Sequence, residues 1–71
     1  MKSEAYLKKI GDNITRIRKQ KGFTSKELGY RCDIDKSALI HIEKGRVNIT
    51  ANTLLKIAEA LEVEVKAFFE F

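Results

Sequence analysis

The stretch DIDKSALIHIEKG, residues 33–45, holds side chains whose types and spacing suit recognition of a polar partner. At a helical repeat, Leu39 and Ile42 share one side, and the opposite side carries Lys36, Ser37, Ala38 and His41. Lysine, serine and histidine exchange hydrogen bonds, while alanine offers only a methyl group. This outward face is neither apolar nor strongly charged, so it suits a partner that presents hydrogen-bonding groups.

Catalytic and metal-binding chemistry has little support in the sequence. His41 is the only histidine and has no base or metal partner within a few residues, and the single Cys32 cannot build a zinc site. Asp33 and Asp35 form a D-x-D pair, but a calcium loop needs further oxygen ligands and a distal glutamate. No glycine-rich phosphate loop is present. We therefore expect no catalytic residues, no metal and no cofactor, and we do not expect an enzyme.

Length and composition favour one small domain over residues 1–71. The chain is 44% hydrophobic and 34% charged, which allows folding around a modest core. It has no apolar run long enough to span a membrane, and its first residues, MKSEAYLKKIGD, lack the apolar segment of a signal peptide. A single cysteine excludes an intrachain disulfide and suits a reducing compartment. These features predict a cytoplasmic protein.

Charge is distributed unevenly along the chain. Residues 1–50 contain 12 Lys and Arg against 6 Asp and Glu, whereas residues 51–71 contain 2 against 4. The first 50 residues therefore carry a net charge of +6 within a total of +4. A basic surface in this part of the chain indicates a polyanionic partner.

Two helices are predicted in the first half of the chain. The first runs from Ser3 or Glu4 to Lys21, with apolar residues three and four apart at Leu7, Ile10, Ile14 and Ile17. Its other face is most simply a solvated basic face, with Lys8, Lys9, Arg16 and Lys19. The second begins after Thr24, which forms a capping box with Glu27, and it turns inward Leu28, Gly29 and Cys32. Cys32 is interpreted as a small core residue, and a reactive thiol is the alternative.

Three more helices complete an all-α prediction. Asp33 to Asp35 should form a turn, with Asp35 as N-cap of a third helix that ends at Glu43 or Lys44. After a loop, Thr50 caps a fourth helix with an apolar stripe of Leu54, Leu55, Ile57, Ala58 and Leu61. Residues 65–69 are predicted as a short fifth helix, although alternation at residues 63 and 65 also fits an edge strand.

The second and third helices, joined by a three-residue turn and preceded by a basic helix, have the layout of a helix-turn-helix. In this motif the second helix enters the major groove of DNA while the first crosses the backbone. The groove floor offers donors, acceptors and thymine methyl groups, which the outward face of residues 36–41 can meet. This layout predicts recognition of double-stranded DNA.

The chain also resembles the Cro/C1-type helix-turn-helix regulators, the Xre family. The resemblance covers residues 10–69 and rests on four ordered pieces: IGDNITRIRKQKGFT, then ELG, then IHIEKGRVNIT, then TLLKIAEALEV. It implies a compact five-helix, lambda-repressor-like domain. It also implies that Lys36, Ser37 and His41 reach base edges, with Ala38 and Ile40 beside them.

The same resemblance assigns residues that hold the DNA backbone. Thr24 and Ser25 would contact phosphate at the start of the second helix, and the far phosphates would be held by Lys44, Arg46 and Asn48. Arg18 and Glu43 would form a partly buried ion pair between the first and third helices. Three positions depart from the family pattern, since Ser25, Asp33 and Ile49 stand where Gln, Gly and Pro are common.

The C-terminal residues are predicted to form a homodimer interface. One recognition helix covers few base pairs, so a specific regulator, here expected to be a repressor, needs two helices on a palindromic operator. The apolar end of the chain exceeds what one small core is expected to absorb, which points to Val63, Val65, Phe69 and Phe71, with Phe68 in the core. For the C-terminal residues, a frayed tail is the simpler alternative.

The alternative function for the whole chain is an antitoxin whose C-terminus binds a toxin protein and whose DNA binding is autoregulatory.

Overall fold

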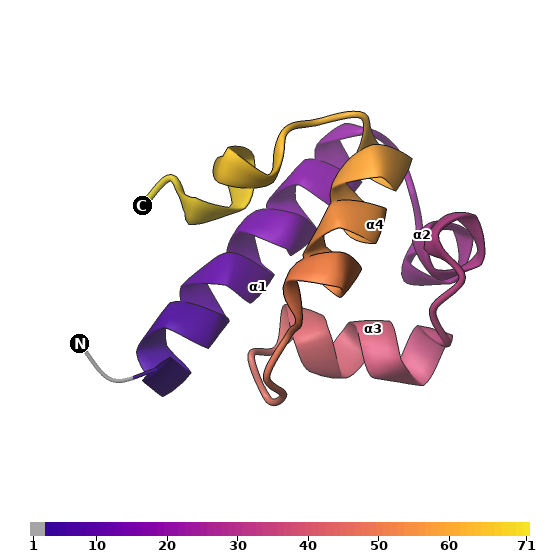
Figure 1. Ribbon diagram of the computed structural model, residues 1–71. Helices are drawn as coiled ribbons and strands as arrows, with labels where there is room; N and C mark the ends of the chain where they lie inside the picture. Colours follow the sequence, from indigo (N-terminus) through magenta and orange to yellow (C-terminus); the bar gives the residue numbers. More distant parts are fainter. Residues whose placement is uncertain (1–2) are drawn as a thin grey trace.

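The computed structural model describes residues 3–71, and four α-helices and one 3₁₀ helix make up most of this range (Figure 1). The elements are α1 (Ser3–Gln20), α2 (Ser25–Cys32), α3 (Lys36–Glu43), α4 (Ala51–Leu61) and η1 (Val65–Phe69). No strand occurs among these described residues, so the all-α prediction is confirmed and the edge-strand alternative is not. The start of the predicted domain at residue 1 lies outside the described residues.

The predicted fifth helix has the expected bounds but a different geometry. Ala67 donates its backbone N–H to the carbonyl of Glu64 at 3.0 Å, which is the tighter bonding pattern of a 3₁₀ helix. A five-residue segment makes few i→i+4 bonds, so the tighter turn is accessible to it. Residues 3–71 therefore form four α-helices and a 3₁₀ turn rather than five α-helices.

Threonine side chains begin two of the helices as expected. Thr24 Oγ1 accepts the N–H of Glu27 at 3.1 Å, and the Glu27 carboxylate accepts the N–H of Thr24 at 3.0 Å, which completes the capping box. Thr50 Oγ1 accepts the N–H of Thr53 at 3.2 Å. Asp35 holds the N-cap position of α3 but makes no side-chain capping bond, so the prediction fails for its side chain.

All four α-helices end in the same paired hydrogen-bond arrangement, the Schellman motif. Its left-handed residue is Gly22 after α1 and Gly45 after α3, but Asp33 and Glu62 hold the same position with φ of 57° and 58°. Asp33 therefore forms the turn of the helix-turn-helix without a glycine, as the sequence predicts. The identical endings keep the connections between helices short.

The core lies between α1 and the other elements, as the helical periodicity predicts. Six of its side chains have less than 2% exposure: Ile14, Leu28, Leu39, Ile57, Leu61 and Phe68. Cys32 is also buried, with 5% exposure. The predicted stripe of the fourth helix is too broad by one residue, because Leu55 is 51% exposed. Position 55 follows a buried leucine, and consecutive helical residues point about 100° apart.

α1 crosses α3 closely because glycine occurs at the crossing point. A Cβ atom added at Gly11 would overlap the carbonyl oxygen of Glu43, and one added at Gly45 would lie 2.6 Å from the Cα of Lys8. Both approaches are to backbone atoms, which cannot move aside as a flexible side chain does. Gly11 therefore has a packing role in the middle of a helix, where glycine otherwise lowers stability.

The C-terminal segment packs along α1 on a different side from α3 (Figure 1). Asn13 donates its side-chain amide to the carbonyls of Phe68 at 3.0 Å and Glu70 at 3.4 Å. The ring of Phe71 lies 5.8 Å from that of Tyr6 and 5.2 Å from Lys9 Nζ. These contacts hold the segment on α1, which argues against a frayed tail. Across residues 3–71, no helix has the length and apolar character that crossing a membrane requires.

Candidate nucleic-acid interface

The outward face of α3 is exposed where the sequence places it. Leu39 has 0% exposure and Ile42 has 9%, so they fix this helix against the core. The side turned to solvent carries Lys36, Ser37, Ala38 and His41, which are all exposed. Four candidate base-reading residues therefore share one accessible helical surface.

Ile40 belongs to a different part of the surface. It is only partly exposed and lines an open hollow of about 430 Å³ together with Ser25 of α2 and Lys44. The hollow also includes three residues of α1 (Lys8, Asp12 and Thr15) and, from the end of α3, Glu43. The structure thus groups Ile40 with two predicted phosphate-contacting residues rather than with the outward face of α3.

At the start of α2, fewer donors are open to the predicted phosphate contact than the sequence indicates. The backbone N–H of Thr24 is already bonded to the Glu27 carboxylate, and its hydroxyl oxygen accepts a bond from Glu27. Thr24 is exposed, and Ser25 is partly exposed beside it. Hydrogen bonds from the Thr24 backbone N–H and side chain lower the pKa of the Glu27 carboxyl, which keeps it charged.

The residues after α3 are held by the end of that helix. Gly45 N–H bonds to the carbonyl of Ile42 at 3.0 Å, and Arg46 N–H bonds to that of His41 at 3.0 Å. Lys44, Arg46 and Asn48 are all exposed. Since the backbone of Arg46 is tied to that of His41, its guanidinium projects from a position that is fixed relative to α3.

The Arg18–Glu43 ion pair is present and joins α1 to the end of α3. Arg18 Nε lies 2.8 Å from Glu43 Oε2, and its Nη2 lies 3.2 Å from Oε1, a bidentate arrangement. Arg18 Nη1 also donates to the carbonyl of Phe23 at 2.8 Å. The two side chains are only 10% and 8% exposed. The pair therefore joins the end of α3 to α1, and both charges are largely withdrawn from solvent.

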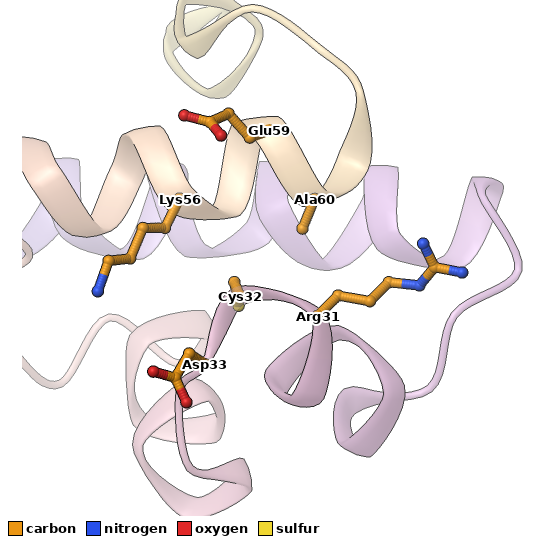
Figure 2. A pocket seen from close by; sticks show the side chains of 6 residues that line it. All are labelled: Arg31, Cys32, Asp33, Lys56, Glu59 and Ala60. Carbon is orange, nitrogen blue, oxygen red and sulfur yellow. The ribbon is translucent and has the colours of Figure 1, made fainter.

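A second hollow lies between the end of α2 and α4, and Figure 2 shows its six lining residues. Cys32 and Ala60 point toward each other across the helix contact, while Arg31, Asp33 and Lys56 extend outward at the rim. The Cys32 thiol donates to the carbonyl of Leu28 at 2.9 Å, and burial raises its pKa. These features support the core interpretation of Cys32 over the reactive one, because an attacking thiol needs a lowered pKa.

The residues predicted for an interface at the C-terminus divide into two groups. Val63 and Val65 are partly buried against the core, whereas Phe69 is 45% and Phe71 is 53% exposed. Phe68 is fully buried, as predicted. The two phenylalanines, with Tyr6 at 44% exposure, leave aromatic surface on the side of α1 that holds η1.

Within residues 3–71 no group of three or more His, Cys, Asp and Glu side chains is placed to hold a metal ion.

Lys8 was not singled out from the sequence, where it was interpreted as part of a solvated face, but it lines the hollow beside Ser25 and Lys44. The only sequence signal was Gly45, since a glycine after a helix permits close approach of another segment.

Comparison with known proteins agrees with this arrangement. Residues 14–68 match the helix-turn-helix family HTH_3. The chain is 39% identical over 56 residues to the uncharacterized HTH-type transcriptional regulator y4dJ of Sinorhizobium fredii, covering 79% of this chain and 73% of the relative. It is 32% identical over 63 residues to the control protein C.BamHI of Bacillus amyloliquefaciens, covering 87% and 78%.

A solved structure shows the same arrangement of helices. The crystal structure of the restriction-modification controller protein C.AhdI from Aeromonas hydrophila superposes with a TM-score of 0.89 at 31% sequence identity. The superposition covers 92% of this chain and 98% of that one. The agreement therefore extends over most of the chain and is not confined to the helix-turn-helix.

Proposed function

The chain belongs to the Cro/C1-type helix-turn-helix family of DNA-binding transcriptional regulators, and we propose that it recognises a specific double-stranded DNA sequence through α3. The observation that carries the proposal is the exposed outward face of α3. Its four residues offer donors, acceptors and a methyl group, which are the groups that base edges in the major groove can meet. Lys36, Ser37 and His41 read base edges, and Ala38 lies beside them.

Residues at both ends of the helix-turn-helix position the protein on the DNA backbone. Lys44, Arg46 and Asn48 are exposed just beyond α3, where they contact phosphates on one side of the groove. Thr24 and Ser25 contact the backbone on the other side through their side chains, since the N–H of Thr24 is already bonded to Glu27. Ile40 lies between these groups in the hollow and contacts a sugar or a thymine methyl group.

Binding of fluorescent DNA duplexes tests this assignment. An operator is first selected from a random DNA pool with the unaltered protein, and affinities for the operator and for random DNA are then compared. Ser37→Ala and His41→Ala should weaken operator binding by about 1–3 kcal/mol each at particular base pairs and leave random DNA almost unaffected. Lys19→Ala on α1 is the matched control, because Lys19 is exposed but lies outside the hollow and the α3 face. Equal losses on both DNAs would remove the base-reading role.

The proposal includes a homodimer that binds a palindromic operator. One recognition helix contacts too few base pairs for a unique site, and two-fold symmetry places a second helix about 34 Å away. Exposed Phe69 at the end of η1 and Phe71 just after it supply an apolar surface, and Val63 and Val65, nearby in the sequence, pack against the core. A second copy of the chain covers this surface without blocking DNA.

Light scattering at micromolar concentration tests the dimer. Truncation after residue 67 is unsuitable, because it removes the buried Phe68. The double variant Phe69→Ser/Phe71→Ser should instead give a folded monomer with weaker operator binding. Tyr30→Ser is the control, since Tyr30 is 89% exposed on α2, away from η1. A monomeric parent protein, or a double variant that stays dimeric, would contradict the proposed interface.

Occupation of an operator by such a dimer excludes other proteins from the same DNA, so we assign the regulator a repressing role. This role places the protein in the compartment that holds the DNA, the cytoplasm. The relatives described above are named as a transcriptional regulator, a control protein and a controller, which favours this function over a toxin-binding one. A reporter gene placed behind the selected operator should lose expression when the protein is produced, and increased expression would overturn repression.

A further inference from the structure

The hollow at the junction of α1, α2 and α3 brings a charged pair of α1 next to the proposed DNA contacts. Lys8 and Asp12 of α1 line it together with Ser25 and Lys44. Close packing explains this position, since a Cβ atom at Gly45 would lie 2.6 Å from the Cα of Lys8. The loop after α3 therefore rests directly on the backbone of Lys8, and α1 borders the surface that includes Lys44.

The charged residues in the hollow differ in how far they are paired with other charges. Glu43 is bonded in two places to Arg18 inside the fold, so its charge is compensated there. Lys44 makes no ion pair among the described residues. Lys8 Nζ lies 2.6 Å from Asp12 Oδ1, with the two side chains 58% and 60% exposed. The hollow thus contains two exposed lysines, Lys8 and Lys44, and one exposed carboxylate, Asp12, which is paired with Lys8.

We propose that Lys8 contacts a DNA phosphate from α1, and that Asp12 competes with the phosphate for Lys8. This inference rests on the proposed DNA binding and adds a third helix to the backbone contacts. A phosphate that approaches Ser25 and Lys44 enters a hollow where Lys8 is within reach and Asp12 repels it. Asp12 therefore weakens attraction to every DNA sequence equally, and a larger share of the affinity depends on contacts to bases.

The simpler interpretation is an ordinary surface pair between residues four apart on a helix, which contributes only to helix stability. A second exposed pair in the protein separates the two interpretations. Lys66 Nζ lies 3.4 Å from Glu64 Oε2 beside η1, with side chains 80% and 77% exposed. Neutralising Glu64 frees Lys66 and changes the net charge by the same amount as neutralising Asp12, which frees Lys8. However, η1 packs on α1 away from α3 (Figure 1). A general effect of charge would therefore appear at both pairs.

Duplex-binding titrations at several salt concentrations test the proposal. Asp12→Asn should tighten binding to operator and random DNA alike by about fivefold, the effect of roughly 1 kcal/mol from one nearby charge in water. Lys8→Gln should weaken both and lower the slope of log affinity against log salt by about one for each protomer. Glu64→Gln and Lys66→Gln should each change affinity less than twofold, as roughly expected for exposed, screened charges. Circular dichroism and light scattering confirm that each variant stays folded and keeps its oligomeric state.

A double-variant cycle tests the competition itself. Asp12→Asn should increase DNA affinity less in a Lys8→Gln background than in the parent, because Asp12 then has no Lys8 ammonium group for which to compete with the phosphate. An Asp12→Asn effect equal to that of Glu64→Gln, or one independent of Lys8, would overturn the inference. A parent protein without salt-dependent DNA binding would overturn the proposed function instead, so the two failures are distinguishable.

Discussion

Replacing Glu43 by alanine tests how strongly the fold depends on the ion pair between α1 and α3. In the intact protein, Arg18 Nε and Nη2 lie 2.8 and 3.2 Å from the Glu43 carboxylate, and Nη1 bonds to the Phe23 carbonyl. The side chains are 10% and 8% exposed, so water cannot replace the carboxylate fully. Glu43→Ala leaves a charged guanidinium with two unsatisfied nitrogens, at a cost of about 3–5 kcal/mol.

This cost is large for so small a domain. A chain of this length has a free energy of unfolding of about 4–10 kcal/mol, so the variant loses a third of it or more. Each kcal/mol lowers the Tm of a domain of this size by about 4–8 °C, which predicts a fall of at least about 12 °C. Thermal and urea unfolding followed by circular dichroism measure the loss, and an unchanged urea m-value shows that the midpoint shift reflects stability.

Two further variants give the measurement its reference points. Asp12→Asn removes the exposed pair on the same helix, where a loss of only about 0.3–0.5 kcal/mol is expected. Arg18→Met/Glu43→Leu removes both buried charges and should recover most of the loss, apart from about 1 kcal/mol for the lost bond to the Phe23 carbonyl. A Glu43→Ala midpoint within about two degrees of the parent would refute the reasoning.

Three other outcomes follow from contacts in the structure. Gly11→Ala should lower the free energy of unfolding by about 1–3 kcal/mol, because the added Cβ would overlap the carbonyl oxygen of Glu43. Urea unfolding measures this change, and a gain in stability would show instead that α3 can move aside. Hydrogen bonds from Thr24 lower the pKa of Glu27 below its ordinary value of 4.5. The charged Glu27 carboxylate therefore contributes fully to stability above pH 4.5, and this contribution is lost as the pH falls through the pKa of the folded state. Glu27→Gln should flatten this acid dependence of the Tm, and an unaltered profile would contradict it. Arg46→Ala should weaken binding to all DNA alike and reduce the salt slope by about one, whereas a loss confined to the operator would make Arg46 a base contact.

Helix positions and ends could be predicted from the sequence because their causes are local. The capping box of Thr24 and Glu27 spans four residues, and the left-handed turn at Asp33 depends on a short side chain that tolerates φ of 57°. The buried and exposed sides of α3 follow from its 3.6-residue repeat. Adjacent residues point in different directions in an α-helix and in a 3₁₀ helix alike, which is why Phe68 could be predicted as buried and Phe69 as exposed. The outward α3 residues could therefore be placed on one surface before any tertiary contact was known.

Tertiary structure decided which separate segments meet, because those contacts join residues far apart in the sequence. Arg18 and Glu43 are 25 residues apart, and only the crossing of α1 over α3 at Gly11 brings their side chains into bidentate contact. Lys8 and Lys44 are 36 residues apart, so local sequence patterns likewise give no sign of the hollow that they share. Local patterns specify which side of a helix is apolar, but the packing of complementary surfaces specifies which other helix that side faces. The exposed face of α3 was thus determined by the sequence of one helix, and the charged residues around it were brought together by the packing of three helices.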